Sequence, residues 1–302
     1  MSDRFKVKPK TSQVIYEGRS TAVGLFRSHP KNPNFGGPHI IGGTLLVFPR
    51  TSVTITHIDQ RPVLADPNIV MLYNNEQIYT RSQHSPQGDI CEWFCFEDCY
   101  VAEAIQRFNP AVESHPHKPF DFVYTPTDAT TYLLQRLVVD HILSGKDIDP
   151  LFVEETLLTL LRRVIFNCYR LRGVSAHKSR EGHEQELAMA VREVLAMQFS
   201  TNVSLEQIAG QLSYSPFHLC RVFQKHMGQS IHQYLKHLRL RTALEFVTEA
   251  NVNLTDLALK SGFASHSHFT EAFRRTFGAP PSAFRSPTRQ HIHELHSKIS
   301  IA

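Results

Sequence analysis

Four cationic side chains fall in two short segments near the end of the chain. Arg221 and Lys225 lie in the first segment, and Arg274 and Arg275 lie in the second. Such side chains bind the phosphates and base edges of nucleic acids when a helix presents them. The chemistry that they indicate is therefore recognition of a nucleic acid, and it depends on the elements that carry them.

Residues 204–285 contain one pattern twice. SerLeuGluGlnIleAla from Ser204 recurs as AsnLeuThrAspLeuAla from Asn253, and each copy continues through a turn into a segment that ends in Phe and Gly. Ser204 and Asn253 lie 49 positions apart, whereas Ser215 and Ser265 lie 50 apart, so the second turn has one extra residue. Apolar residues recur every three or four positions, which predicts two pairs of short amphipathic helices. Ser215 and Ser265 are placed to cap the second helix of each pair.

A helix pair of this kind is a helix-turn-helix, which puts its second helix in the major groove. Between the copies, residues 231–249 contain neither Gly nor Pro and carry apolar residues at helical spacing, so we expect one long helix there. It would hold the two pairs at a fixed separation. Two linked recognition helices would enter successive major grooves, roughly 34 Å apart. Binding of both can require the B-DNA duplex to bend.

Six sequence elements accompany the repeat: IleAla at Ile208, SerProPheHisLeuCysArgValPhe from Ser215, ArgLeuArg from Arg239, SerGlyPhe from Ser261, PheThrGluAlaPheArgArg from Phe269, and PheGlyAlaProProSerAlaPheArg ending at Arg285. Together they resemble the AraC/XylS family of bacterial transcription regulators. The resemblance covers roughly a third of the chain and rests on co-occurrence, because one helix-turn-helix pattern alone is weakly specific.

The resemblance implies base contacts from both second helices. In the first helix the positions are Phe217, Cys220, Arg221 and Lys225, to which we add Ser215 and His218; in the second, the exposed side carries His266, Ser267, Thr270 and Arg274. Arg221 is the strongest candidate, since a guanidinium can donate two hydrogen bonds to guanine. Glu271 would either accept from a cytosine amino group or point away from the DNA. The histidines could equally be ordinary surface residues.

The charge is concentrated in the same part of the chain. Residues 185–302 hold 12 Lys and Arg against 8 Asp and Glu, which accounts for the whole net charge of +4. No apolar run reaches membrane-spanning length, and MetSerAspArgPheLys at the N-terminus is unlike a signal peptide. We therefore expect a cytoplasmic, nucleoid-associated protein without a membrane contact. Five Cys fit reduced thiols better than a disulfide framework.

Residues 5–125 contain short β-favouring runs separated by Gly, Pro and Asn, which indicates a small barrel or sandwich. The resemblance implies a cupin-like β-barrel here. Two helices are expected within 129–171, and the second has a strong apolar face that either covers the barrel or makes a dimer. The expected class is α+β, with a sensor and dimerisation domain at 1–172, a linker at 173–184, a DNA-binding domain at 185–290 and a tail at 291–302.

A metal or catalytic site is a weaker interpretation of the first half. His84, Cys91, Cys95 and Cys99 do not have the spacing of structural zinc ligands, and Cys91 and Cys95 would share a strand face with Trp93. The chain also lacks a phosphate loop, a nucleophile elbow and a paired-histidine helix motif. We expect no enzyme activity, no cofactor and no metal.

Aromatic strand residues could line an effector pocket or simply fill the barrel. The candidates for effector binding are Tyr73, Tyr79 and Trp93, with Arg50, Arg81 or His84 placed to orient an anion.

The sequence thus predicts a homodimeric regulator of double-stranded DNA, in which a small-molecule effector shifts the population of dimer arrangements. Activation through RNA polymerase is what the resemblance implies. Two alternatives stay open: a constitutive DNA-binding protein whose barrel is only a dimerisation scaffold, and a cupin-type enzyme fused to a DNA-binding domain.

Overall fold

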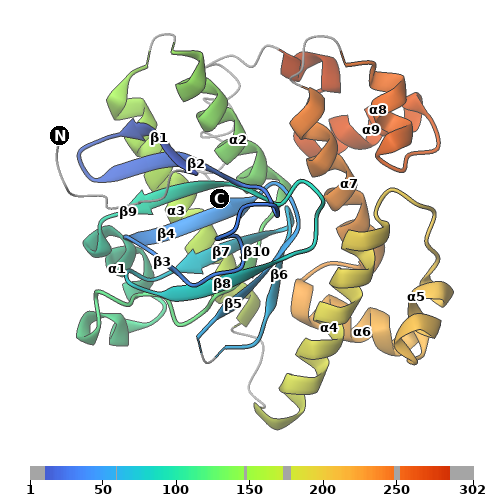
Figure 1. The fold of residues 1–302 in the computed structure, drawn as a ribbon, viewed down its shortest axis with the longest axis horizontal. Helices are drawn as coiled ribbons and strands as arrows, with labels where there is room; N and C mark the ends of the chain where they lie inside the picture. Colours follow the sequence, from blue (N-terminus) through green and yellow to red (C-terminus); the bar gives the residue numbers. More distant parts are fainter. Residues whose placement is uncertain (1–10, 59, 146–147, 173–177, 248–251, 286–302) are drawn as a thin grey trace. The chain divides into compact units, whose positions relative to one another are not determined.

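The computed structural model describes residues 11–58, 60–145, 148–172, 178–247 and 252–285 (Figure 1). These form two compact units: the first unit comprises 11–65 and 69–169, and the second unit comprises 66–68 and 170–285. The fold is mixed α/β, with the strands in the first unit and a helical second unit. The expected tail, 291–302, and residues 173–177 of the expected linker lie outside the described residues.

The strands of the first unit form two antiparallel sheets. The six-stranded sheet has the order β1-β2-β9-β4-β7-β10, and the four-stranded sheet has the order β3-β8-β5-β6. The strands are β1 (Ser12–Glu17), β2 (Thr21–Ser28), β3 (His39–Ile40), β4 (Thr44–Pro49), β5 (Val53–His57), β6 (Val63–Ala65), β7 (Ile69–Tyr73), β8 (Ile78–Gln83), β9 (Asp89–Phe96) and β10 (Tyr124–Pro126).

The expected closed, cupin-like barrel is not confirmed, because no ladder among the described strands joins the two sheets. Among the described strands the chain passes between the two sheets six times, and at the crossing from β6 to β7 Pro67 has no N–H to donate to a ladder. Both sheets nevertheless contribute buried apolar side chains to one interior, among them Leu45 and Trp93 of the six-stranded sheet and Val53 of the four-stranded sheet.

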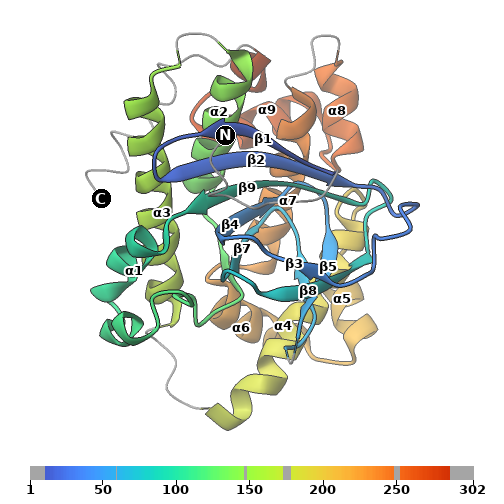
Figure 2. The same cartoon turned by 60° about the vertical axis from the view of Figure 1, so that its left-hand side comes forward.

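The helices of the first unit lie beside the six-stranded sheet (Figures 1 and 2). They are α1 (Asp98–Gln106), the 3₁₀ helix η1 (Pro110–Ser114), α2 (Ala129–Ser144) and α3 (Pro150–Arg172). Asp128 caps α2 by accepting from the Thr131 N–H at 2.9 Å, and its carboxylate also accepts from Arg163 and Asn167 on α3. One side chain therefore begins α2 and ties it to α3.

A buried ion cluster fixes α2 to the sheet. Glu92 of β9 is fully buried, and its carboxylate pairs with Arg136 of α2 and, at 3.2 Å, with Arg50. A buried carboxylate is tolerated only when cations and hydrogen bonds surround it. Arg50 and Arg136 meet that need, so both are committed to the structure of the first unit.

The second unit contains two helix pairs. The helices are α4 (Lys178–Gln198), α5 (Leu205–Leu212), α6 (Pro216–Met227), α7 (Ile231–Val247), α8 (Leu254–Lys260), α9 (His266–Phe277) and the 3₁₀ helix η2 (Pro281–Arg285). The first helix pair is α5 and α6, and the second helix pair is α8 and α9. Helix α4 begins inside the segment expected to be a linker, because the residues from Glu184 to Ala190 are mostly strong helix formers.

The turns of the two helix pairs match as far as Tyr214 and Phe263. Ser213 and Gly262 both adopt positive φ, at 59° and 83°, and the next residue donates its N–H to Ala209 or Ala258, respectively. The extra residue of the second turn is Ala264, which precedes the cap of α9.

Helix α7 supports both pairs through its buried side chains. Arg239 donates from Nε to the Phe199 carbonyl at 2.6 Å and from Nη2 to the Thr201 carbonyl at 2.7 Å, which fixes the connection before α5. Arg241 is fully buried and donates to the Asn68 side chain at 2.6 Å. The ArgLeuArg motif therefore has a structural role, because its cations satisfy carbonyl groups inside the second unit.

Residues Asp66–Asn68 belong to the core of the second unit. The Asp66 carboxylate pairs with Arg192 at 3.2 Å and accepts from the Tyr234 hydroxyl at 2.6 Å, and Asn68 donates to the Tyr234 carbonyl at 2.9 Å. Asp66, Arg192 and Tyr234 are all fully buried. A network of this kind is stable only when it is satisfied as a whole, so α4 and α7 are held in one arrangement.

Replacing Gly262 by Ala tests the turn of the second helix pair. A Cβ at this position would meet Arg239 Nε and the Phe199 carbonyl, each at 2.9 Å, in a backbone conformation that L-residues disfavour. We expect the free energy of unfolding of the second unit to fall by about 1–3 kcal/mol, measured by denaturant titration with helical circular dichroism. The matched change Ser213→Gly should stay within about 1 kcal/mol of the parent. An unchanged stability for Gly262→Ala would contradict the packing described.

Candidate nucleic-acid interface and ligand cavity

The two second helices, α6 and α9, begin in the same way. The Ser215 hydroxyl accepts from the His218 N–H at 3.2 Å, and the Ser265 hydroxyl accepts from the His268 N–H at 3.1 Å. Both caps are those expected from the sequence. Because its oxygen is used in the cap, Ser215 positions the helix, and any contact with DNA would come from its remaining hydroxyl proton or backbone.

Helix α6 separates a buried face from an exposed one. Leu219 and Phe223 are fully buried, whereas Phe217 is 81% exposed in the first turn. Arg221 and Lys225 follow on the exposed side, and Cys220 is half-buried. Phe217 is the most exposed of the large apolar side chains among the described residues, and Phe can contact a thymine methyl group. The exposed face of α6 thus carries Phe217 in the first turn, Arg221 in the middle and Lys225 in the last turn.

Helix α4 holds both of these cations with one carboxylate. Glu184 lies 3.1 Å from Arg221 Nη2 and 2.6 Å from Lys225 Nζ. The hydrogen bond from Lys225, together with that from Arg221, lowers the pKa of Glu184 to about 2. The carboxylate is therefore ionised at neutral pH, and a phosphate or a guanine must replace it to engage either side chain.

Helix α9 presents a different surface. Phe269 and Phe273 are fully buried, while His266, Ser267 and Arg274 are exposed and Thr270 is half-buried. Glu271 accepts from Arg274 at 2.8 Å and from Arg275 at 2.7 Å. The hydrogen bonds from Arg274 and Arg275 lower the pKa of Glu271. The Glu271 carboxylate is thus paired with two cations of its own helix.

The two helix pairs differ at the position that Arg221 occupies in α6. Arg221 and Glu271 lie 50 positions apart, which is the spacing of the two Ser caps, so an arginine in α6 corresponds to a glutamate in α9. A cation and a carboxylate prefer different base edges. The two surfaces therefore differ in charge at this position.

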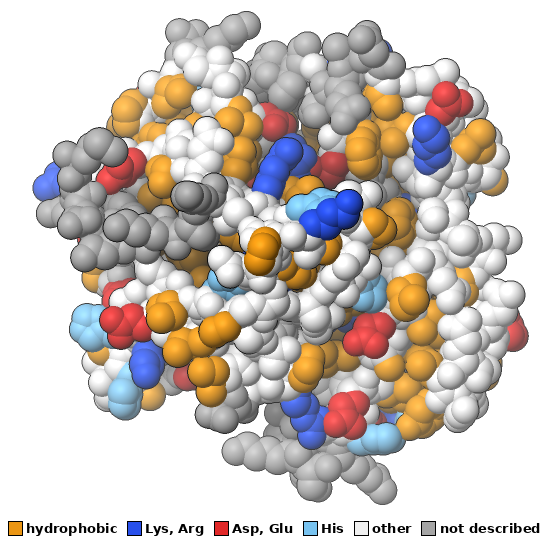
Figure 3. Space-filling model, viewed as in Figure 1, with side chains coloured by type: hydrophobic (Ala, Val, Ile, Leu, Met, Phe, Trp, Pro, Cys, Tyr) orange, Lys and Arg blue, Asp and Glu red, His pale blue; other side chains and the backbone are white. Residues whose placement is uncertain are grey.

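Positive charge is local rather than global in this protein. On the face drawn in Figure 3, Lys and Arg side chains are scattered and do not form one basic patch. This agrees with the net charge of only +4. The placement of cations on α6 and α9 carries more weight than the total charge.

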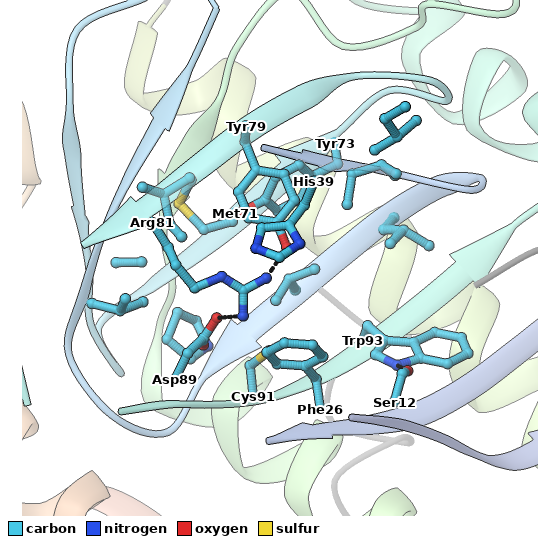
Figure 4. Close-up of a pocket in the computed structure, with 18 of the residues that line it drawn as sticks. Ser12, Phe26, His39, Met71, Tyr73, Tyr79, Arg81, Asp89, Cys91 and Trp93 are labelled. Carbon is cyan, nitrogen blue, oxygen red and sulfur yellow. Dashed lines mark hydrogen bonds and ion pairs between the residues drawn. The ribbon is translucent and has the colours of Figure 1, made fainter. Parts of the chain in front are cut away.

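A cavity of about 100 Å³ lies in the first unit, between residues of both sheets (Figure 4). Its apolar lining comes mainly from β2, β4, β5, β7 and β9 and includes Phe26, Leu45, Val47, Ile55 and Trp93. Four of the six residues predicted for effector binding line it: Tyr73, Tyr79, Arg81 and Trp93. The interior of this unit is therefore not packed solid.

The other two predicted residues do not line the cavity. Arg50 pairs with the buried Glu92 instead. His84 follows the end of β8, where it is half-buried outside the lining. Arg50 and His84 were predicted as effector ligands because of their charge alone. The pattern of a strand does not show on which side of the sheet a charged residue near its end will lie.

A buried ion pair that the sequence did not reveal is the main polar feature of the cavity. Arg81 is 3% exposed, and its Nη1 lies 3.0 Å from the Asp89 carboxylate. Its Nη2 donates to the Tyr79 hydroxyl at 2.6 Å, and its guanidinium lies 4.4 Å from the centre of the Phe26 ring. Asp89 is the first residue of β9. Its only signal in the sequence is a carboxylate at the start of an apolar strand.

Cys91, Cys95 and Cys99 have free thiols, and burial is the main cause that raises the pKa of Cys91 and that of Cys95. Within the described residues, no group of three or more His, Cys, Asp or Glu side chains is arranged to hold a metal ion. The helices in that part of the chain also lack the combination of length and apolar character needed to cross a membrane.

Comparison with known proteins places residues 208–286 in a family described as a helix-turn-helix domain. The chain is 32% identical over 89 residues to PqrA of Proteus vulgaris, with 30% of this chain and 73% of PqrA covered. It is 30% identical over 106 residues to the HTH-type transcriptional activator AarP of Providencia stuartii, with 34% of this chain and 78% of AarP covered.

A longer match joins the chain to the regulatory protein PocR of Salmonella typhimurium, with 24% identity over 156 residues. That match covers 51% of this chain and 51% of PocR, so the chain spans about half the length of this relative. The relatives are regulators of transcription, and they confirm both the family resemblance and the interpretation that the chain is not an enzyme.

Replacing Glu184 by Gln tests how this carboxylate controls the α6 surface. The change removes the negative charge that competes with DNA for Arg221 and Lys225. Because partly exposed ion pairs contribute up to about 1 kcal/mol each, we expect DNA affinity to rise by about fivefold, with a steeper salt dependence. Fluorescence anisotropy with a duplex at several salt concentrations measures both.

Glu193→Gln is the matched control, because Glu193 is an exposed residue of the same helix and the change in charge is identical. An equal gain in both variants would mean that only net charge matters. A loss of affinity in Glu184→Gln would mean that Glu184 positions the two cations for DNA rather than withholding them.

Proposed function

Because the chain belongs to the AraC family of transcriptional regulators, we propose that it is a sequence-specific regulator in which α6 and α9 read two parts of one DNA site. The observation that carries this proposal is the pair of Ser-capped helices, each with a buried Phe face and an exposed face that bears cations. Side chains near the N-terminus of such a helix reach base edges in the major groove.

The α6 surface is proposed to give most of the sequence preference. Arg221 would recognise guanine through its two donors, and Phe217 would contact a thymine methyl group nearby. Lys225 would bind a phosphate, which contributes affinity without sequence information. Cys220, Ser215 and His218 lie between or beside these groups and would shape the contact.

The α9 surface is proposed to bind a different sequence. His266, Ser267 and Thr270 offer uncharged donors and acceptors, and Arg274 adds a cation whose charge Glu271 moderates. Two unlike surfaces imply an asymmetric DNA site with two short blocks, roughly one helical turn apart. We expect some bending of the duplex between them.

The cavity of the first unit supports regulation by a small molecule. A scaffold used only for dimerisation would gain stability from a filled interior, since an unfilled volume loses packing contacts. The structure instead keeps about 100 Å³ open beside a buried ion pair. A ligand in this cavity would alter DNA binding only by favouring one of two arrangements of the protein.

We also propose how the protein regulates transcription, how it assembles and where it acts. AarP is described as a transcriptional activator, and we propose activation through RNA polymerase for this chain as well. Leu143, Leu151 and Phe166 of the α2 and α3 region are large apolar side chains that stay at least 42% exposed, which supports a homodimer contact there. A regulator of this kind would act on DNA in the cytoplasm.

Substitutions in α6 test the proposed division of roles. Arg221→Ala should cost about 1–3 kcal/mol at one base position and relax the preference there, because a bidentate contact to one base is lost. Lys225→Ala should weaken binding evenly across sequences and reduce the salt slope by about 1. Both are measured by anisotropy on a selected site and on its single-base variants.

The two variants are each other's control, since each removes one positive charge from the same helix face. If both leave affinity and base preference unchanged, α6 does not read DNA and the proposed interface is wrong. If both weaken binding evenly, Arg221 contacts the backbone and sequence preference must come from other residues.

A further inference from the structure

The chemistry of the cavity in the first unit defines the ligand that it would hold, and this inference rests on the proposed function. Most of the lining is apolar, including Phe26, Val53, Ile55, Met71 and Trp93. An apolar cavity of about 150 Å³ admits benzene, so a cavity of about 100 Å³, which is a third smaller, suits a compact molecule no larger than one small ring.

The charges of the cavity are already matched. The Arg81 guanidinium faces the Asp89 carboxylate, and the pair is almost entirely buried. An anionic ligand would compete with Asp89 for the same cation, and a cationic ligand would compete with Arg81. Either would leave a buried charge without a partner, which is costly.

The other titratable groups around Arg81 are uncharged at neutral pH. Burial, and secondarily the charge of Arg81, lowers the pKa of His39. Burial is the main cause that raises the pKa of the Tyr73 and Tyr79 hydroxyls and of the Cys91 thiol. No further ion therefore lines the cavity to balance a charged ligand, within the residues that the structure describes.

Two polar groups of the lining have hydrogen-bonding capacity left over. Arg81 Nε is buried and has no hydrogen-bond partner among the described residues. Arg81 is drawn in the centre of Figure 4, beside Tyr79 and Asp89. The Tyr73 hydroxyl lines the cavity and makes no hydrogen bond within the described part of the chain, while its ring stacks on His57 at 5.0 Å. A buried donor that lacks an acceptor favours a ligand that brings one.

We propose that the cavity binds a compact, uncharged molecule of about one ring, whose single carbonyl or hydroxyl oxygen accepts hydrogen bonds from Arg81 and Tyr73. The ring occupies the apolar part of the lining. A sugar fits poorly, because its many hydroxyls would be buried against Leu45, Val47 and Ile55 without partners.

Trp93 makes the proposal measurable in the intact protein. It is the single tryptophan of the chain and it lines the cavity, so its fluorescence reports occupancy directly. The full-length protein is titrated with four small probes: cyclobutanone, cyclobutanol, cyclopropanecarboxylate and cyclobutylamine. Calorimetry with the same probes checks the affinities. We expect saturable binding of the two neutral probes and binding more than about tenfold weaker for the two ions.

A matched pair of variants tests the hydrogen bond. Tyr73→Phe removes one hydroxyl from the cavity and should weaken cyclobutanone binding by about fivefold. Tyr16→Phe removes a hydroxyl from β1 that lies outside the lining, and it should leave binding unchanged. Both variants keep the ring, so the fold is retained and the comparison isolates the oxygen.

The outcomes separate this inference from the proposed function. If cyclopropanecarboxylate binds more tightly than cyclobutanone, the ligand is an anion and the inference is overturned, although effector binding stands. If neither neutral probe saturates, the inference is overturned as well. Neutral probes that bind in the cavity without changing DNA affinity would support the ligand class and contradict gating by the effector.

Discussion

The burial of α7 is the constraint on which the second unit depends. Nine of its residues are buried, among them Tyr234, Leu240 and Val247, so the helix has little freedom to rotate or slide. It contacts α6 on one side of the duplication and α8, α9 and η2 on the other. Phe223 of α6 meets Tyr234 edge to face at 5.2 Å, which locks the first helix pair onto α7. Because both pairs share this support, neither reading helix can move independently without opening the core.

In the proposed function, specificity would come from the position of a few side chains, and electrostatic attraction would be kept low. Glu184 restrains Arg221 and Lys225, and Glu271 restrains Arg274 and Arg275. Each helix therefore offers cations already held by a carboxylate, which lowers the gain from nonspecific phosphate contacts. A protein built in this way would bind random DNA weakly and discriminate by base contacts. Arg221 in α6 and Glu271 in α9 occupy matched positions, and their opposite charges would favour a DNA site with two different halves.

The sequence predicted the elements governed by local rules. The repeat, the Ser215 and Ser265 caps and the buried Phe faces follow from residues a few positions apart, and α2, α3 and α7 lie close to the ranges expected for them. It did not predict pairs that join distant segments. Glu184 pairs with Arg221, which lies 37 positions later in the sequence. Glu92 pairs with Arg50, which therefore does not line the cavity. Arg81 and Asp89 are close in sequence, yet their pairing depends on the register of β8 and β9 in different sheets. The two separate sheets likewise depend on long-range pairing, which alternation alone does not determine.

The central claim is that α6 and α9 together read one asymmetric DNA site. The measurement that tests it most directly is selection of genomic fragments by the purified full-length protein at near-physiological salt, followed by sequencing of the retained fragments. The account predicts a recurrent motif with two different short blocks, roughly one helical turn apart. A motif with two identical blocks would contradict the unlike reading surfaces. Retention without any sequence preference, with and without the neutral ligands, would contradict sequence-specific regulation itself.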